Sequence, residues 1–219
     1  MTSRASARRT SRAILVAAVA MPAVALAHPH IFVDAKFEAV AGADGGLSEV
    51  RDVWHFDEVF SSSVLLDFDK NGNSTLDPPE LAAVAKTVQK SLAQYNYYTS
   101  ITIGGKAVTL EKPEVMHAAY EDGMLTLSFV QKPTVKTPLK GLIVFGVYDP
   151  TLYTALDFAD DSDLKTTGTG FDRCTRKIVR PDSKEILAEN QAMLTTLFFN
   201  DPTGTDYSQL VATRLEVRC

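Results

Sequence analysis

The chain has 219 residues, of which 45% are hydrophobic and 22% charged, with 12 glycines and 10 prolines. This composition excludes disordered, collagen-like and coiled-coil chains. The net charge is −5, and it becomes −9 (18 basic against 27 acidic residues) without the first 27 residues, which hold four arginines and no acid. We do not expect such an acidic protein to bind nucleic acid, which requires a basic face.

The first 27 residues have the pattern of a signal peptide. Arginines precede an apolar segment from Ala13 to Ala27, and its end, Ala25-Leu26-Ala27, offers the small residues that signal peptidase requires. This segment is shorter than the ~20 residues that span a bilayer. We therefore expect cleavage after Ala27, export to the periplasm and no membrane span afterwards. An uncleaved anchor is the alternative interpretation.

The rest of the chain predicts an α+β fold with mainly antiparallel strands. Apolar residues alternate over 30–40 and 47–57, on both sides of a glycine-rich turn, which is typical of a β-hairpin. Helical spacing then predicts a helix-loop-helix insertion at 57–95, with helices at 57–68 and 79–95. Turn residues separate the strands expected at 99–103, 106–110, 114–120, 124–131, 141–148 and 152–158. A strand at 174–179, a C-terminal helix at 184–199 and a strand at 212–219 complete the prediction.

Cys174 and Cys219 are the only cysteines. In an oxidising compartment an even pair most often forms a disulfide, while two free thiols or a pair of metal ligands are the alternatives. We expect residues 28–158 to form a β-rich domain. Residues 159–219 are then a C-terminal β-α-β segment that this disulfide closes.

The segment between the two predicted helices has the spacing of an EF-hand calcium loop. Oxygen ligands occupy positions 1, 3, 5, 7, 9 and 12 of this loop, the seventh through its backbone carbonyl: Asp69, Asn71, Asn73, Thr75, Asp77 and Glu80. Ser74 takes the sixth position, where glycine is usual because φ is positive there. We therefore expect weak, structural calcium binding. Since Asp77 and Glu80 also suit the start of a helix, a capped turn without calcium is the alternative.

Cleavage after Ala27 makes His28 the first residue, with His30 two positions later. An N-terminal histidine chelates metal through its α-amine and imidazole, and His30 adds a second imidazole. The pair predicts a site for a divalent transition metal such as zinc or nickel. A solvated chain start is the alternative, and the sequence leaves open whether His55, Asp57 or His117 contribute.

The sequence gives little support for catalysis, and an oxidative enzyme whose copper is bound by the N-terminal histidine is the alternative. The chain contains no G-x-S-x-G, no H-E-x-x-H and no glycine-rich phosphate loop, so we do not expect an enzyme.

Five segments together resemble one bacterial family of exported proteins of unknown function, often labelled periplasmic components of an ABC-type transport system. They are His28-Pro29-His30-Ile31-Phe32-Val33-Asp34, Trp54-x-Phe56-Asp57-Glu58, the Asp69–Glu80 loop, Tyr97-Tyr98-Thr99 and Tyr148-Asp149-Pro150-Thr151-x-Tyr153. Family genes often lie beside permeases of the nickel/cobalt-exporter type. The resemblance thus implies a metal-binding accessory protein whose partner is an inner-membrane metal permease. The alternative is a calcium-stabilised structural or interaction module of the cell envelope with no role in transport.

Overall fold

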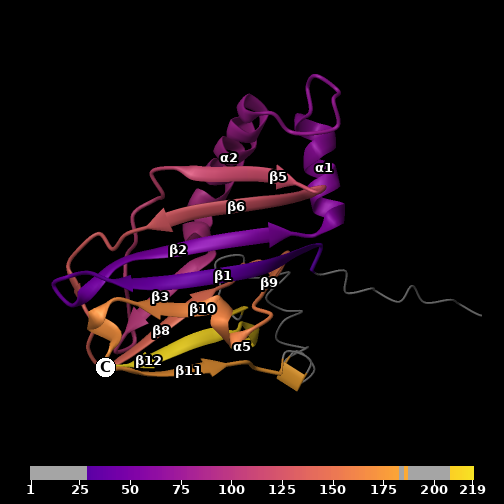
Figure 1. Ribbon diagram of the computed structural model, residues 1–219. Helices are drawn as coiled ribbons and strands as arrows, with labels where there is room; N and C mark the ends of the chain where they lie inside the picture. Colours follow the sequence, from indigo (N-terminus) through magenta and orange to yellow (C-terminus); the bar gives the residue numbers. More distant parts are fainter. Residues whose placement is uncertain (1–28, 183–184, 187–207) are drawn as a thin grey trace, which may run out of the picture.

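The computed structural model describes residues 29–182, 185–186 and 208–219, which form two β-sheets with helices at one side (Figure 1). The predicted signal peptide, His28 and nearly all of the helix predicted at 184–199 lie outside these residues. In the described ranges, no helix is both long and apolar enough to cross a membrane.

The elements follow the predicted order closely. The strands are β1 Ile31–Ala41, β2 Gly46–Phe56, β3 Thr99–Ile103, β4 Lys106–Ala107, β5 Met116–Glu121, β6 Met124–Gln131, β7 Thr137–Pro138, β8 Leu142–Val147, β9 Thr154–Asp157, β10 Leu164–Thr167, β11 Thr175–Val179 and β12 Arg214–Arg218. The α-helices whose bounds lie within the described residues are α1 Glu58–Phe68, α2 Pro78–Leu92 and the short C-terminal α5 Ser208–Val211. Three 3₁₀-helices complete the set: η1 Ala93–Tyr98, η2 Asp161–Asp163 and η3 Thr169–Phe171. This arrangement confirms the predicted α+β class and the helix-loop-helix insertion.

The first sheet, which we call sheet A, has the order β10-β1-β2-β6-β5. Two parallel strands share the outer edge of β1, since β9 pairs with its first half and β10 with its second, while β7 extends the pairing of β2. The second sheet, sheet B, is antiparallel throughout, with the order β11-β12-β8-β3-β4. Figure 1 shows sheet B beneath β1 and β2, and α1 where β2 ends and β6 begins.

The core lies between the two sheets and α2, because each strand turns its apolar alternate residues to the same side. In β1, Val33, Ala35, Phe37 and Ala39 are all buried. The rings of Phe37 and Phe145 meet across the two sheets with centroids 5.6 Å apart. Val84 and Leu92 of α2 are buried in the same core, and α2 contacts β5. The opposite face of sheet A therefore carries most of the polar residues of its strands.

Some boundaries differ from the prediction. The strand expected at 106–110 is only two residues long, because Leu110 leaves the β3 edge to make an isolated bridge with Pro133. The second helix ends at Leu92 and continues as the 3₁₀-helix η1. Neither β7 nor β10 was predicted, since β7 has two residues and β10 lies in a polar stretch without apolar alternation.

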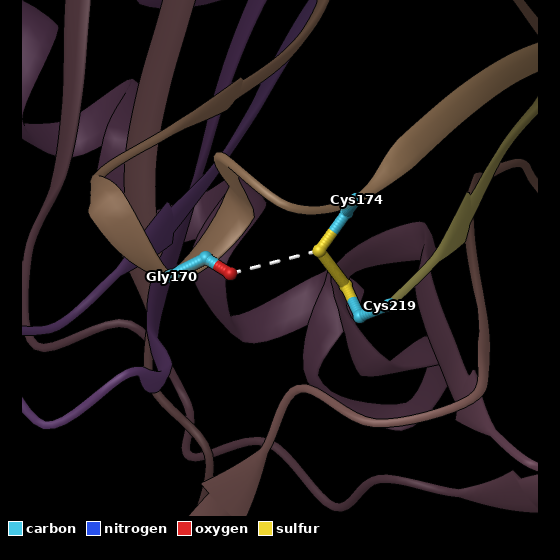
Figure 2. Close-up of a disulfide and its surroundings, with 3 residues drawn as sticks. All are labelled: Gly170, Cys174 and Cys219. Carbon is cyan, nitrogen blue, oxygen red and sulfur yellow. Dashed lines mark hydrogen bonds between the residues drawn. A yellow bond between two sulfur atoms is a disulfide. The ribbon is translucent and has the colours of Figure 1, made fainter.

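Cys174 and Cys219 form the expected disulfide, which joins the start of β11 to the end of β12 (Figure 2). The carbonyl oxygen of Gly170 lies 3.6 Å from the Cys174 sulfur. Cys219 also exchanges two backbone hydrogen bonds with Gly141, which fixes the last residue beside β8. The strands of residues 159–219 pair with strands of both sheets, so this segment completes sheet A through β10 and sheet B through β11 and β12.

Candidate functional sites

His30, one of the two predicted transition-metal ligands, is exposed and immediately precedes β1. Its backbone N–H donates to the carbonyl of Tyr153 over 2.8 Å, and the two rings lie 4.8 Å apart. The loop before β9 therefore holds the backbone of His30, and the residue as a whole stays exposed with its ring beside that of Tyr153. His28, the other predicted ligand, lies outside the described residues.

Asp57 joins the start of β1 to the start of α1. One carboxylate oxygen accepts the Phe32 N–H over 2.8 Å, and the other accepts the Phe60 N–H over 2.9 Å as the N-cap of α1. Partial burial acts to raise the pKa of Asp57, but these N–H groups outweigh it and hold the pKa below 3.8. The carboxylate is therefore ionised near neutral pH and already engaged by backbone donors, which makes it a positioning group for this end of β1.

The other two described histidines lie on the face of sheet A that points away from the core. His55 stands opposite Asp34 of β1 and Thr126 of β6, and its Nδ1 lies 2.9 Å from Thr126 Oγ1. Asp157 of β9 stands opposite Asp34, so the three strands bring two carboxylates and an imidazole into one row. His117 lies two strands beyond, opposite Ser128.

These side chains are not brought together as a closed metal site. Among the residues that the structure describes, no group of three or more His, Cys, Asp and Glu side chains is arranged to hold a metal ion. The register also places His55 about four residues, or ~13 Å, along the sheet from His30. A metal bound at His30 therefore needs further donors, and the predicted source of these is His28.

The segments that carry the family resemblance nevertheless meet in space. The first contacts the second through Phe32 and Asp57, and the first contacts the last through His30 and Tyr153. Tyr148 donates its backbone N–H to the carbonyl of Tyr98 over 2.8 Å. Four of the five segments are therefore linked by direct contacts, although they are scattered over more than 120 positions of the sequence.

The predicted calcium loop closes around Asp69. Its Oδ1 accepts the N–H of Gly72 over 2.7 Å and that of Asn73 over 3.2 Å, and its Oδ2 accepts the N–H of Ser74 over 2.9 Å. Ser74 has a φ of 63°, as the sixth position of such a loop requires. The backbone of the loop thus takes the expected form even without glycine at that position.

Glu80 closes the other end of this loop. One of its oxygens accepts the Asp77 N–H over 2.9 Å, as the capped-helix alternative requires, and the other accepts the Lys70 N–H over 2.7 Å. Asp77 Oδ2 accepts from the amides of Asn71 and Asn73 over 2.7 and 3.1 Å. A capped turn therefore accounts for Asp77. Glu80 also accepts the Lys70 N–H at the beginning of the loop, and a helix cap alone does not require this second hydrogen bond.

Sequence reasoning missed two features of the interior. The first is Asp52 of β2, which is 1% exposed. The sequence could have indicated its burial, because Asp52 lies between Val50 and Trp54 at the alternate positions that face the core. In η1, three consecutive residues with positive φ, Asn96, Tyr97 and Tyr98, turn the chain into β3. Asparagine is favoured in this conformation, but tyrosine is not, so no local signal marks the whole turn.

The chain belongs to a family described as protein of unknown function DUF1007, whose model matches residues 13–219. A protein of Spirochaeta aurantia, described as an uncharacterized 15.5 kDa protein in the trpE 3′ region, is 28% identical over 109 residues. These residues make up 49% of this chain and 78% of that protein. Neither description states an activity, so the transport label and the link to a permease stay part of the proposal below.

Proposed function

We propose that this protein is an exported, metal-binding accessory protein of a transport system for a divalent transition metal such as zinc, nickel or cobalt. The main support is that three of the five resemblance-bearing segments meet near the exposed His30. The Tyr153 carbonyl accepts the N–H of His30 and the Asp57 carboxylate accepts the N–H of Phe32, so these contacts hold the backbone from His30 to Phe32 beside the predicted mature N-terminus.

In this proposal the metal is the cargo, and the protein delivers it to an inner-membrane permease. His30 supplies one neutral imidazole, and His28 supplies an imidazole and an α-amine after cleavage. Such a small donor set at a chain terminus favours exchange with a partner over permanent retention, because among the described residues no cluster of further His, Cys, Asp or Glu side chains could enclose the ion.

Calorimetric titration with Zn²⁺ and Ni²⁺ tests this proposal on the protein that begins at His28. Adding one alanine before His28 destroys the amine–imidazole chelate, and we expect it to weaken binding at least tenfold. His30→Ala should do the same, while His117→Ala, an exposed histidine of β5, serves as the matched control. Equal binding by all four proteins, or binding by none, would overturn the proposal.

A calcium-stabilised structural module is the second candidate, and the contacts of Asp69 and Glu80 across the loop favour it. If calcium binds there, the melting temperature should rise in millimolar Ca²⁺ relative to chelator. Glu80→Gln should abolish this rise, whereas Glu111→Gln, an exposed glutamate outside the loop, should retain it. A wild-type melting temperature that does not respond to Ca²⁺ would rule out this candidate without touching the first.

A further inference from the structure

A pocket of about 230 Å³ lies where η1, the β3–β4 hairpin and the turn after β8 meet. Its lining contains three tyrosine rings and no charged side chain: Tyr95, Asn96, Tyr98, Thr99, Ser100, Ile101, Ala107, Val108, Tyr148 and Pro150. It is smaller than the 300–1,000 Å³ of a typical small-molecule site. Its size and lining suit one uncharged ring.

The aromatic walls are held in place by the surrounding fold. The Tyr98 ring stacks on the buried Trp54 with centroids 5.8 Å apart. Tyr148 lies over Gly146, where an added Cβ would come within 3.0 Å of the ring. Tyr97 and Tyr98 also have a left-handed backbone conformation, which costs about 1–2 kcal/mol for each residue. Such strain persists where surrounding contacts enforce it and is concentrated at functional sites.

Ile101, which lines the pocket, has a backbone N–H for which no acceptor is found among the described residues. Ile103 and Lys106 flank a two-residue turn, so odd-numbered residues of β3 direct their N–H and C=O groups toward the β4 side. The Ile101 carbonyl accepts the Val108 N–H over 2.9 Å, but β4 ends at Ala107 and the chain then leaves this edge. Within the described part of the chain, the Ile101 N–H has no hydrogen-bond acceptor, although Ile101 is only 2% exposed.

We propose that this pocket binds an extended, uncharged peptide segment of a partner protein. A proline or aromatic ring of the segment packs against Tyr95, Tyr98 and Tyr148, as in other aromatic-lined peptide grooves. A carbonyl beside that ring accepts the N–H of Ile101, which β4 leaves unpaired. No charged side chain lines the pocket, so an acidic or basic side chain would be desolvated there without a counter-ion in the lining, which favours an uncharged ring. This site is distinct from His30 and does not depend on metal.

Blocked pentapeptides that differ only in a central proline, tyrosine or lysine test the proposal on the mature protein. Trp54, the only tryptophan of the chain, stacks on Tyr98, so its fluorescence reports occupancy of the pocket. The amide resonance of Ile101 reports the new hydrogen bond, and Thr102, whose amide faces β8, is the matched amide control. Tyr95→Ala removes one wall, and Tyr120→Ala on β5 removes a tyrosine outside the pocket.

We expect the proline or tyrosine peptide to change the Trp54 fluorescence and shift the Ile101 amide, with at least tenfold weaker binding by Tyr95→Ala than by Tyr120→Ala. The lysine peptide should bind at least tenfold more weakly than the better of the other two. The proposal fails if no peptide binds at millimolar concentration, if the lysine peptide binds equally well, or if the Ile101 amide does not move. It also fails if the Trp54 fluorescence and the Ile101 amide change with protein concentration but not with added peptide, because a second copy of the chain then occupies the pocket.

Discussion

Asp52 is a buried side chain whose protonation makes the stability of this protein depend on pH. It lies on the core face of β2, and neither of its carboxylate oxygens has a hydrogen-bond partner among the described residues. Burial raises the pKa of Asp52 to about 8, and the nearby Trp54 and Thr99 side chains oppose this shift only in part. The folded protein therefore holds a proton on Asp52 over a pH range in which the unfolded chain has lost it.

This proton makes stability fall as pH rises. The contribution of this proton to the free energy of unfolding is fully present below 3.8, the pKa of Asp52 in the unfolded chain. It is lost between about pH 4 and pH 8, where the free energy of unfolding falls by up to about 1.4 kcal/mol per pH unit. We expect Asp52→Asn to remove this dependence, so that its melting temperature falls less than that of the wild type between pH 5 and pH 8. Thermal melts followed by circular dichroism measure this. Asp67→Asn, an exposed carboxylate of α1, should follow the wild type, and an unchanged slope in Asp52→Asn would contradict the prediction.

At the scale of the element, α1 depends on Asp57 for its beginning. This residue satisfies the first-turn N–H of Phe60 and at the same time fixes Phe32 of β1. One side chain therefore sets both the start of the helix and the angle at which the chain leaves the sheet.

Asp57→Ala should lower the free energy of unfolding by about 1–2 kcal/mol at pH 7, since that is the usual cost of a lost N-cap. Because the pKa of Asp57 lies below 3.8, its contribution is present above about pH 4 and is lost as the pH falls further. The difference from the wild type should therefore shrink at pH 3 in urea unfolding. Glu58→Ala changes the neighbouring exposed acid and should cost clearly less. Equal costs for the two variants would show that the cap contributes nothing.

The β3–β4 hairpin and η1 show how the ends of short elements create a pocket. The early end of β4 leaves a donor of β3 unpaired, and the left-handed turn of η1 places two tyrosines beside it. Neither feature contributes a regular element, yet together they form the pocket to which we assign peptide binding.

At the scale of the whole molecule, the disulfide connects the last strand of the fold to β11 across 45 positions. In the chain-entropy model, closing a loop of this length stabilises the protein by about 4 kcal/mol. The double variant Cys174→Ser, Cys219→Ser should therefore unfold at a clearly lower urea concentration than the oxidised wild type. Reduced wild-type protein is the control and should match the double variant. A loss below about 1 kcal/mol would show that the pairing of β12 with β8 alone secures the end of the chain.

Much of this fold could be predicted because its signals are local. The alternation of Val33, Ala35 and Phe37 identifies β1, and the spacing of Val84, Ala85 and Leu92 identifies α2. The Asp69–Glu80 loop was recognisable for the same reason, since side chains at fixed short spacing produce it. Very short strands such as β4 and β7 carry too few residues to show a period.

The sequence by itself determined the fold class, the hairpin and the helix-loop-helix insertion, and it predicted the disulfide between the only two cysteines, which the structure confirms. These follow from periodicity, turn residues and counting, which involve neighbours along the chain. Tertiary structure alone decided that β9 and β10 lie beside β1, that His30 meets Tyr153 and Phe32 meets Asp57, and that the N–H of Ile101 finds no acceptor in the described part of the chain. These contacts join residues far apart in the sequence, and their geometry depends on how the two sheets pack, which no local pattern encodes.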